Sequence, residues 1–330
     1  MSGRAPGFWQ GPPGPLARLL QPASLLYGAV AAHRLRHAPR VGVGLPVLCV
    51  GNPTVGGSGK TPVALALGQA ASRMGLKPGF LSRGHGGRVG AARLLGAGDT
   101  TREVGDEPLL LSAGGPVAVG ADRARGAALL EQAGCDCIIM DDGFQSARIA
   151  IDCALLVVDR RAGLGNGLCL PAGPLRAPLP LQLSHAHAVL AMGEGNGADG
   201  FLEEAGSRGL PVFSARLAPK NPQAVRDRRL LAFAGIGRPE KFFSSLEEAG
   251  GVVEERRVFG DHHAYRKGEI ATLMREAEER GLVLVTTAKD MVRVRDAFPD
   301  AQALVLEVEA RFGEPDAGER LVGMAVERKA

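Results

Sequence analysis

Short apolar runs separated by polar, helix-like stretches dominate the first two thirds of the chain. Continuous apolar character, rather than strict alternation, is typical of strands that are covered on both faces, as in a parallel sheet. Runs of this kind occupy residues 47–51, 77–83, 116–120, 136–142, 153–159, 187–192 and 210–217. The pattern predicts a doubly wound α/β domain with a mainly parallel sheet over residues 41–220.

A polar, basic segment with two prolines, residues 217–229, predicts a connector between two units. Beyond it, apolar runs again alternate with helix-like segments. The expected helices begin near Pro239 and Lys267, and the later expected strands occupy residues 282–287 and 303–309. This order predicts a second, smaller α/β domain over residues 230–330.

Residues 1–40 form a third region, in which apolar side chains precede several arginines. No run reaches the ~18–20 apolar residues of a membrane-spanning helix, and the prolines, Pro22 among them, argue against a signal peptide. The residues predict an amphipathic helix from Ala23 onward. It can lie in a membrane interface or pack on the protein's own core, and the residues alone leave both open. Its key side chains are Leu25, Leu26, Tyr27, Val30, Arg34, Arg36 and Arg40.

Composition narrows the class of protein. The chain has 330 residues, 45% of them hydrophobic and 22% charged, which is ordinary for a globular protein. Aromatic residues make up 4% of the chain and the net charge is +4, so neither base stacking nor a basic surface predicts nucleic-acid binding. Five cysteines without a C-x-x-C pair favour a reducing compartment and no metal-thiolate site.

A glycine-rich turn lies between the apolar run at residues 47–51 and a helical run near Pro62. The usual phosphate-binding loop has a glycine five residues before its Gly-Lys pair, and here that position is Thr54. The other requirements remain, because the glycines let backbone N–H groups face phosphate oxygens, Lys60 can reach the outer phosphates, and Thr61 suits Mg²⁺. An ordinary strand-to-helix turn is the alternative. We predict ATP and Mg²⁺ as cofactors, and nucleotide contacts from Thr54, Val55, Gly56, Gly57, Ser58, Gly59, Lys60, Thr61 and Pro62.

Two pairs of acidic residues are candidates for the rest of such a site. Asp141 and Asp142 end an apolar strand, as the Mg²⁺-holding carboxylate of phosphate-loop enzymes does, although such a pair is also a common solvated cap. Asp106 and Glu107 follow a loop. A carboxylate there can accept the proton of an attacking hydroxyl, or the pair can simply begin a helix.

Two adjacent histidines, His262 and His263, occupy a loop of the expected smaller domain, in the sequence FGDHHAY. A histidine there can share a proton with a carboxylate across a domain cleft. The spacing gives little support to a zinc site, since no further ligands accompany the pair. Exposed loop histidines without a function are the ordinary alternative.

Eight motifs taken in order resemble the tetraacyldisaccharide 4′-kinases of lipid A biosynthesis. They are VGNPTVGGSGKTP, LSRGHGG, GDEPLLL, MDDGFQ, GNGLCLPAGPLR, FAGIGRPEKFF, DHHAY and TTAKDMVR. The likeness runs from the N-terminal FW to about residue 295, and Thr54 agrees with the pattern of that family. Two positions depart from it, with Ala288 in place of an acidic residue and His85 in place of a tyrosine.

The resemblance implies transfer of the ATP γ-phosphate to the 4′-hydroxyl of a tetraacylated glucosamine disaccharide 1-phosphate. It implies that Asp106 and His262 form the proton-accepting pair, and Lys60 of the loop is the third candidate catalytic residue, as a cation on the phosphates. It also implies Mg²⁺ ligation by Thr61, Asp141 and Asp142. Contacts to nucleotide or substrate are implied for Gln145, Asn166, Arg176 and Glu107.

A lipid substrate favours the membrane interpretation of the N-terminal helix, since four acyl chains keep the acceptor in the bilayer. We therefore expect a peripheral enzyme at the cytoplasmic face of the bacterial inner membrane, with no obligate protein partner. The alternatives are a membrane-associated switch ATPase and a kinase for another small molecule. The ATPases carry a signature lysine where this chain has Val55, and a soluble substrate leaves the apolar N-terminal segment unexplained.

Overall fold

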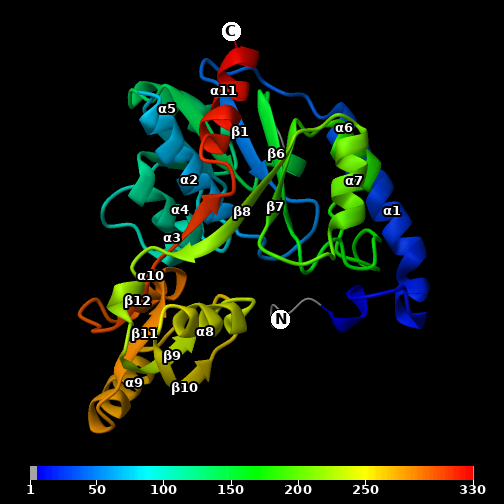
Figure 1. The fold of residues 1–330 in the computed structure, drawn as a ribbon. Coiled ribbons are helices and arrows are strands. Elements are labelled where there is room, and N and C mark those ends of the chain that lie inside the picture. Colours follow the sequence, from blue (N-terminus) through cyan, green and yellow to red (C-terminus); the bar gives the residue numbers. More distant parts are fainter. Residues whose placement is uncertain (1–5, 147, 330) are drawn as a thin grey trace.

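Two sheets, joined by two crossings of the chain, form the fold (Figure 1). The structure is a computed structural model that describes residues 6–146 and 148–329, so residues 1–5 of the expected N-terminal region lie outside it. Within the described residues the larger sheet has nine strands, in the order β13-β8-β7-β6-β1-β5-β2-β4-β3, and the smaller has four, in the order β10-β9-β11-β12. The α/β class expected from the apolar runs is confirmed.

The larger sheet is parallel except at its two edges, where β3 and β13 run antiparallel to their neighbours. At its centre β1 lies between β5 and β6, and Val50 pairs with Asp141 on one side and Leu155 on the other. The carboxyl ends of these strands therefore meet at one edge of the sheet. Its strands are β1 (Val47–Gly51), β2 (Pro78–Ser82), β3 (Arg93–Leu94), β4 (Val117–Val119), β5 (Cys137–Asp141), β6 (Cys153–Asp159), β7 (Ala188–Met192), β8 (Val212–Pro219) and β13 (Val308–Phe312).

Helices cover both faces of this sheet, which explains the continuous apolar runs. In β1, Leu48 and Val50 enter the core on one face, while Val47 and Cys49 enter the core on the other. The first face is covered by α2 (Lys60–Arg73), α4 (Asp106–Leu111) and α11 (Ala317–Lys329). The second is covered by α1 (Pro15–His37), α5 (Arg123–Gln132), α6 (Leu179–Ser184) and α7 (Asp199–Ser207). The short α3 (Thr101–Val104) precedes α4.

The smaller sheet is parallel throughout. One face packs against α9 and α10 around Phe233, and the other packs against α8 around Phe243. Its strands are β9 (Arg229–Ala234), β10 (Val252–Val258), β11 (Val283–Thr287) and β12 (Leu304–Leu306), and its helices are α8 (Pro239–Glu248), α9 (Lys267–Glu279) and α10 (Ala288–Ala297).

The chain returns to the larger sheet near its end, which corrects the expected extent of the smaller domain. Residues 303–309 form two strands rather than one, because the run divides at Glu307. β12 stays in the smaller sheet, whereas β13 pairs with β8 and α11 packs against α2. The two crossings lie side by side, since Asn221 donates to the Val305 carbonyl (3.0 Å) and accepts from the Glu307 N–H (3.0 Å). Residues 308–329 thus belong with the larger sheet.

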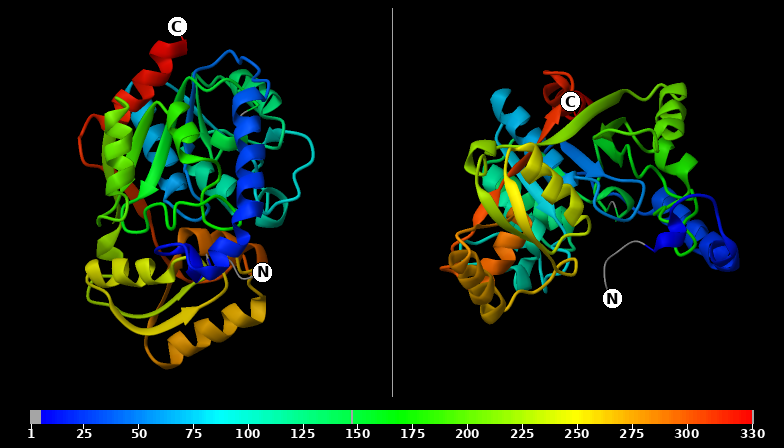
Figure 2. Two further views of the ribbon diagram at one scale, coloured as in Figure 1. Left: turned by 90° about the vertical axis from the view of Figure 1, so that its right-hand side faces the viewer. Right: turned by 60° about the horizontal axis from the view of Figure 1, so that its bottom comes forward.

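The N-terminal helix α1 begins at Pro15, earlier than expected, and Pro22 lies inside it. Small residues on one side, including Ser24 and Gly28, pack on the larger domain, where the Ser24 hydroxyl donates to the Cys169 carbonyl (2.7 Å). The other side leaves apolar side chains exposed at Leu16, Leu19, Leu25, Leu26, Tyr27 and Val30. Figure 2 shows α1 along the outside of the larger domain. Among the described residues, no helix is both long and apolar enough to cross a membrane.

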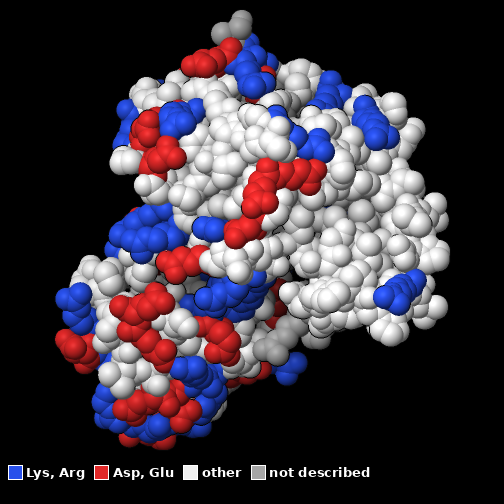
Figure 3. Space-filling model, turned by 45° about the vertical axis from the view of Figure 1, so that its right-hand side comes forward, with Lys and Arg blue, Asp and Glu red and all other residues white. Residues whose placement is uncertain are grey.

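On the face of the molecule shown in Figure 3, charge is distributed unevenly between the two domains. In Figure 3 the smaller domain is densely covered by acidic and basic side chains, whereas much of the larger domain in this view is uncharged.

Candidate active site

The predicted phosphate loop connects the end of β1 to the start of α2. Gly56 and Gly59 have φ values of 117° and 83°, which side-chain-bearing residues rarely adopt, so glycine is required at both. Lys60 begins α2, and its ammonium donates to the Oδ1 of buried Asn52 (3.2 Å). Asn52 also donates to the Gly56 carbonyl (3.3 Å). Sequence reasoning missed Asn52, which holds the loop and its lysine together.

The departure from the usual loop pattern at Thr54 has a structural reason. Thr54 forms an antiparallel bridge with Leu175, and the Val55 N–H donates to the Pro174 carbonyl (2.9 Å). Arg176 donates from its Nε to the Thr54 carbonyl (3.1 Å). The start of the loop is therefore extended backbone held by residues 174–176. A glycine is not needed for such a conformation.

Asp141 ends β5 beside the loop and is 3% exposed. Its Oδ2 accepts a hydrogen bond from the Thr61 hydroxyl (2.9 Å), while its buried Oδ1 has no hydrogen-bond partner among the described residues. Burial raises the pKa of Asp141 to about 7, and the negative charges of Glu107 and Asp142 act in the same direction, against Lys60. The site therefore presents an uncompensated carboxylate oxygen next to a hydroxyl.

Asp142 has different surroundings, although it is the next residue. The Arg176 guanidinium binds it with both Nη atoms, at 2.7 and 3.1 Å, and the Lys60 ammonium lies 3.9 Å away. Burial raises the pKa of Asp142, but Lys60 and Arg176 outweigh that effect and hold it below the usual value. Its backbone φ of 54° fixes the turn after β5. The two aspartates therefore have separate roles in the geometry.

A carboxylate and a histidine meet across the cleft between the two sheets. Asp106 begins α4 and is 3% exposed, and its Oδ2 lies 3.1 Å from the Nδ1 of His262. The His262 backbone has a φ of 56°, and its N–H donates to the Gly235 carbonyl (3.1 Å). Burial raises the pKa of Asp106, but the hydrogen bond from His262, together with Lys289, His262 and Arg293 charges, lowers it to about 2.

The ring of His262 is 44% exposed and lines the cleft, in contrast to the buried carboxylate. Since Asp106 is ionised and can only accept, the Nδ1 of His262 carries the hydrogen, and in the neutral form of the ring Nε2 is then the acceptor. Nε2 lies 3.9 Å from an Asp261 oxygen, beyond hydrogen-bond distance. His263 has other contacts, to Glu269 (3.1 Å) and to the ring of Phe259. It is therefore His262, and not its neighbour His263, that contacts Asp106 in the structure.

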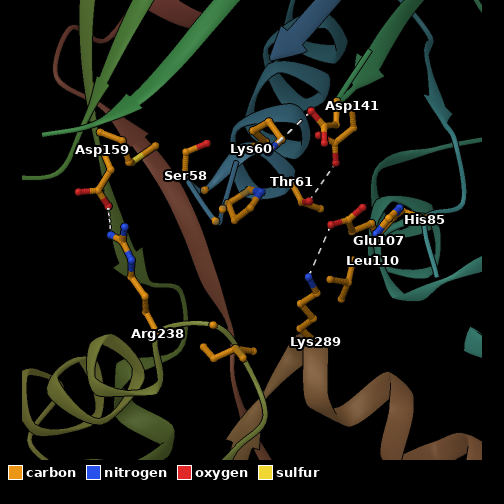
Figure 4. Close-up of a pocket in the computed structure, with 18 of the residues that line it drawn as sticks. Ser58, Lys60, Thr61, His85, Glu107, Leu110, Asp141, Asp159, Arg238 and Lys289 are labelled. Carbon is orange, nitrogen blue, oxygen red and sulfur yellow. Dashed lines mark hydrogen bonds and ion pairs between the residues drawn. The ribbon is translucent and has the colours of Figure 1, made fainter. Parts of the chain in front are cut away.

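Two sets of contacts across the cleft, one on each side of the phosphate loop, were not predicted from the sequence. On one side, Asp159 at the end of β6 accepts from Arg238 (2.8 Å) and Lys241 (2.6 Å) of the smaller domain. On the other, Lys289 lies 3.5 Å from Glu107. Figure 4 shows the Arg238 and Lys289 contacts flanking Lys60 and Thr61.

The remaining expected site residues differ in their placement. Gln145 donates to the Asn52 carbonyl (2.8 Å) and to Gln182 (3.0 Å), so it helps to hold the start of the phosphate loop in place. Asn166 does not line the cleft. Its amide donates to the Ala172 carbonyl (2.8 Å) and its oxygen accepts from the Leu168 N–H (3.1 Å), so backbone groups already use both ends and the structure gives no support to the expected substrate contact.

Comparison with known proteins assigns the chain to a family. The model of the tetraacyldisaccharide-1-P 4′-kinase family matches residues 16–325. The chain belongs to this family. A Mesorhizobium japonicum protein named tetraacyldisaccharide 4′-kinase is 49% identical, over 98% of this chain and 96% of its own. A Brucella ovis protein of the same name is 47% identical, over 99% of this chain and 98% of its own.

A solved structure from the tetraacyldisaccharide 4′-kinase family shares the fold. It is the Aquifex aeolicus LpxK, described as an "apo" form in complex with ATP, which is 23% identical with a TM-score of 0.75. The likeness covers 94% of this chain and 99% of that chain. The two-sheet architecture is therefore that of the 4′-kinase family.

Proposed function

We propose that this protein transfers the γ-phosphate of ATP to the 4′-hydroxyl of a tetraacylated disaccharide 1-phosphate. The family match over residues 16–325 carries this proposal. The cleft supports it, because one continuous cavity is lined by the phosphate loop, by His262 and by the apolar side chains of α1. A phosphate donor, a proton acceptor and an acyl-chain surface can thus meet in one place.

We infer that His262 takes the proton of the attacking hydroxyl. Asp106 orients the His262 ring and stabilises its protonated form. Asp106 is buried and its lowered pKa makes it a weak base, whereas Nε2 of His262 faces the cleft as an acceptor. A buried carboxylate on Nδ1 fixes the tautomer and stabilises the imidazolium that forms. This inference revises the expectation from sequence, which gave the role of base to Asp106.

The residues present fit a magnesium ion beside Asp141. An orphaned, buried carboxylate oxygen with a raised pKa next to a threonine hydroxyl is a site that a divalent cation would complete. Thr61 and Asp141 would hold Mg²⁺, and Asp142, bound by Arg176, would orient the surrounding groups. The ion, when bound, supplies positive charge to the transferring phosphoryl group. Lys60 adds a second positive charge from the loop.

The membrane side of the cleft suits the lipid acceptor. Leu26, Tyr27 and Val30 of α1 line the cleft and are partly exposed, so acyl chains can lie along them. Arg176 and Glu107 also line the cleft and are the remaining candidates for contacts to the sugar or its 1-phosphate. We therefore place the enzyme at the cytoplasmic face of the inner membrane, as a peripheral protein.

Incubation of the purified protein with γ-labelled ATP, Mg²⁺ and the acylated disaccharide 1-phosphate in mixed micelles tests this function. We expect label in the lipid, and none when the acceptor already has a 4′-phosphate. Release of labelled phosphate without labelled lipid would contradict the proposal and favour the switch ATPase.

A further inference from the structure

Lys289 is a cation of the smaller domain that reaches into the cleft. It is the second residue of α10, directly after β11, and its side chain is 27% exposed. Its ammonium lies 3.5 Å from a Glu107 oxygen and 3.7 Å from the Oδ2 of Asp106. Both carboxylates belong to α4 of the larger domain. In Figure 4 Lys289 approaches Glu107, which lines the same cleft as Thr61 and Asp141.

We propose that Lys289 is a catalytic residue that contacts the transferring phosphoryl group from the smaller domain, after leaving Glu107. This proposal rests on the kinase function proposed above. Negative charge on the equatorial oxygens of the phosphoryl group must be stabilised in the transition state. Lys60 supplies one cation from the phosphate loop of the larger domain. Lys289 lies across the cleft, on the smaller domain, beside the dyad of Asp106 and His262 that receives the hydroxyl proton.

Three other cations of the smaller domain are held more firmly than Lys289. Arg293 is 5% exposed on its side chain, and its guanidinium donates to the carbonyls of Gly235 (2.9 Å) and Lys289 (3.1 Å). Arg238 and Lys241 form hydrogen bonds to Asp159 on the far side of the loop. Lys289, in contrast, has two ion-pair contacts longer than typical hydrogen bonds. Its long, flexible stem can move without breaking a hydrogen bond between these groups.

Movement of Lys289 leaves the dyad intact. Asp106 keeps His262 at 3.1 Å and Arg293 at 3.5 Å, so its charge stays compensated when the lysine shifts toward phosphate. Glu107 is 29% exposed and can be solvated at its end of the cleft. The resting contact with Glu107 therefore holds the ammonium within reach of the site.

The simpler alternative is that Lys289 acts only through Asp106, by keeping that carboxylate ionised. The groups that face Asp106 are His262, Lys289 and Arg293, with Glu107 beside it on α4. Removal of Lys289 would then raise the pKa of Asp106 and do nothing more. This alternative predicts that loss of Lys289 has no effect once Asp106 is absent.

A double-mutant cycle separates these two roles. Label transfer is first shown for the wild-type protein, since its absence would contradict the kinase function rather than the role of Lys289. Lys289→Met and Asp106→Ala are then measured singly and together at saturating ATP and lipid. We expect Lys289→Met to lower kcat about 10²-fold in the wild-type background and by a similar factor in the Asp106→Ala background. Lys289→Arg, which keeps the charge, should retain part of the activity.

The matched control is Lys267→Met, which removes a lysine at the start of α9 in the same domain, where it stacks on Phe298. It should leave kcat unchanged, and thermal unfolding should show that all variants are folded. Two results would overturn the proposal: a folded Lys289→Met with kcat within about threefold of wild type, or a loss that disappears in the Asp106→Ala background.

Discussion

Asp106 and Asp141 are both buried carboxylates at the same cleft, yet their surroundings move their pKa values in opposite directions. Asp141 keeps an unpartnered oxygen and has its pKa raised to about 7, chiefly by burial. Asp106 is also penalised by burial, but His262, Lys289 and Arg293 of the smaller domain outweigh the penalty. The larger domain alone therefore leaves the charge at both positions without sufficient partners. The smaller domain supplies them at one, and we infer that a metal ion supplies them at the other.

The largest effect on activity is expected at the phosphate loop, which lies beside Asp141. Lys60→Ala should lower label transfer by roughly 10³-fold or more, because the lysine stabilises charge on the transferring phosphoryl group. Lys77→Ala, an exposed lysine of the same domain, is the control and should have no effect. Initial rates and circular dichroism check both. Near-normal turnover in a folded Lys60→Ala protein would remove the loop from the mechanism.

The two aspartates should respond oppositely to neutralisation when Mg²⁺ is absent. The folded-state pKa of Asp106, about 2, lies below the ordinary value of an aspartate, so its contribution to stability is present above pH ~4 and is lost as the pH falls through ~2. Asp106→Asn should therefore destabilise the protein near neutral pH, by on the order of 2 kcal/mol. Thermal unfolding at several pH values measures this.

For Asp141 the dependence of stability on pH has the opposite sign. Its folded-state pKa, about 7, lies above the ordinary value of an aspartate, so its contribution to stability is present below pH ~4 and is lost as the pH rises through ~7. Asp141→Asn should then raise the unfolding temperature at pH 8, and the gain should shrink toward pH 5. If both variants shift the unfolding temperature in the same direction at pH 8, the contrast between the two sites is wrong.

The sequence predicted those parts of the site that depend on neighbouring residues. The phosphate loop and the Asp141 pair follow from a strand, a turn and a helix in order, and the structure brings Thr61 and Asp141 together as expected. The pairing of Asp106 with His262 joins residues 156 positions apart, and the residues alone left Asp106 open between a base and a helix start. The family resemblance, rather than local pattern, indicated that pair.

Other features depend on packing that no local pattern encodes. Residues 303–309 form one apolar run, but whether a strand joins one sheet or the other is decided by its partners, and the run splits at Glu307. The family resemblance implied a ligand contact for Asn166 in its glycine-rich segment, yet backbone groups use its amide. Lys289 belongs to the motif TTAKDMVR, but only the fold places it opposite Glu107.

The smallest effect is expected at the outer face of α1, away from either aspartate. Leu19 and Leu26 are 76% and 69% exposed and lie seven residues apart, on one side of the helix. Changing both to Ser should weaken binding to anionic vesicles by on the order of tenfold or more, because each removes apolar area that the bilayer would bury. Sedimentation with vesicles measures this.

The control for α1 changes two exposed valines of the smaller domain, Val252 and Val258, to Ser. Vesicle binding should then be unchanged. Equal losses in both double variants would mean that α1 has no special role at the membrane, and would restore the interpretation of a helix that only packs on the protein.

The most direct test of the cross-cleft dyad is a double-mutant cycle on Asp106 and His262, measured as initial rates of label transfer. Asp106→Ala and His262→Ala should each lower kcat by roughly 10²-fold, the range for loss of a general base, with little change in the KM for ATP. Because the two residues act as one unit, the double variant should be no slower than the worse single variant by more than a few fold. Losses that multiply fully would contradict the dyad, as would His263→Ala being as harmful as His262→Ala.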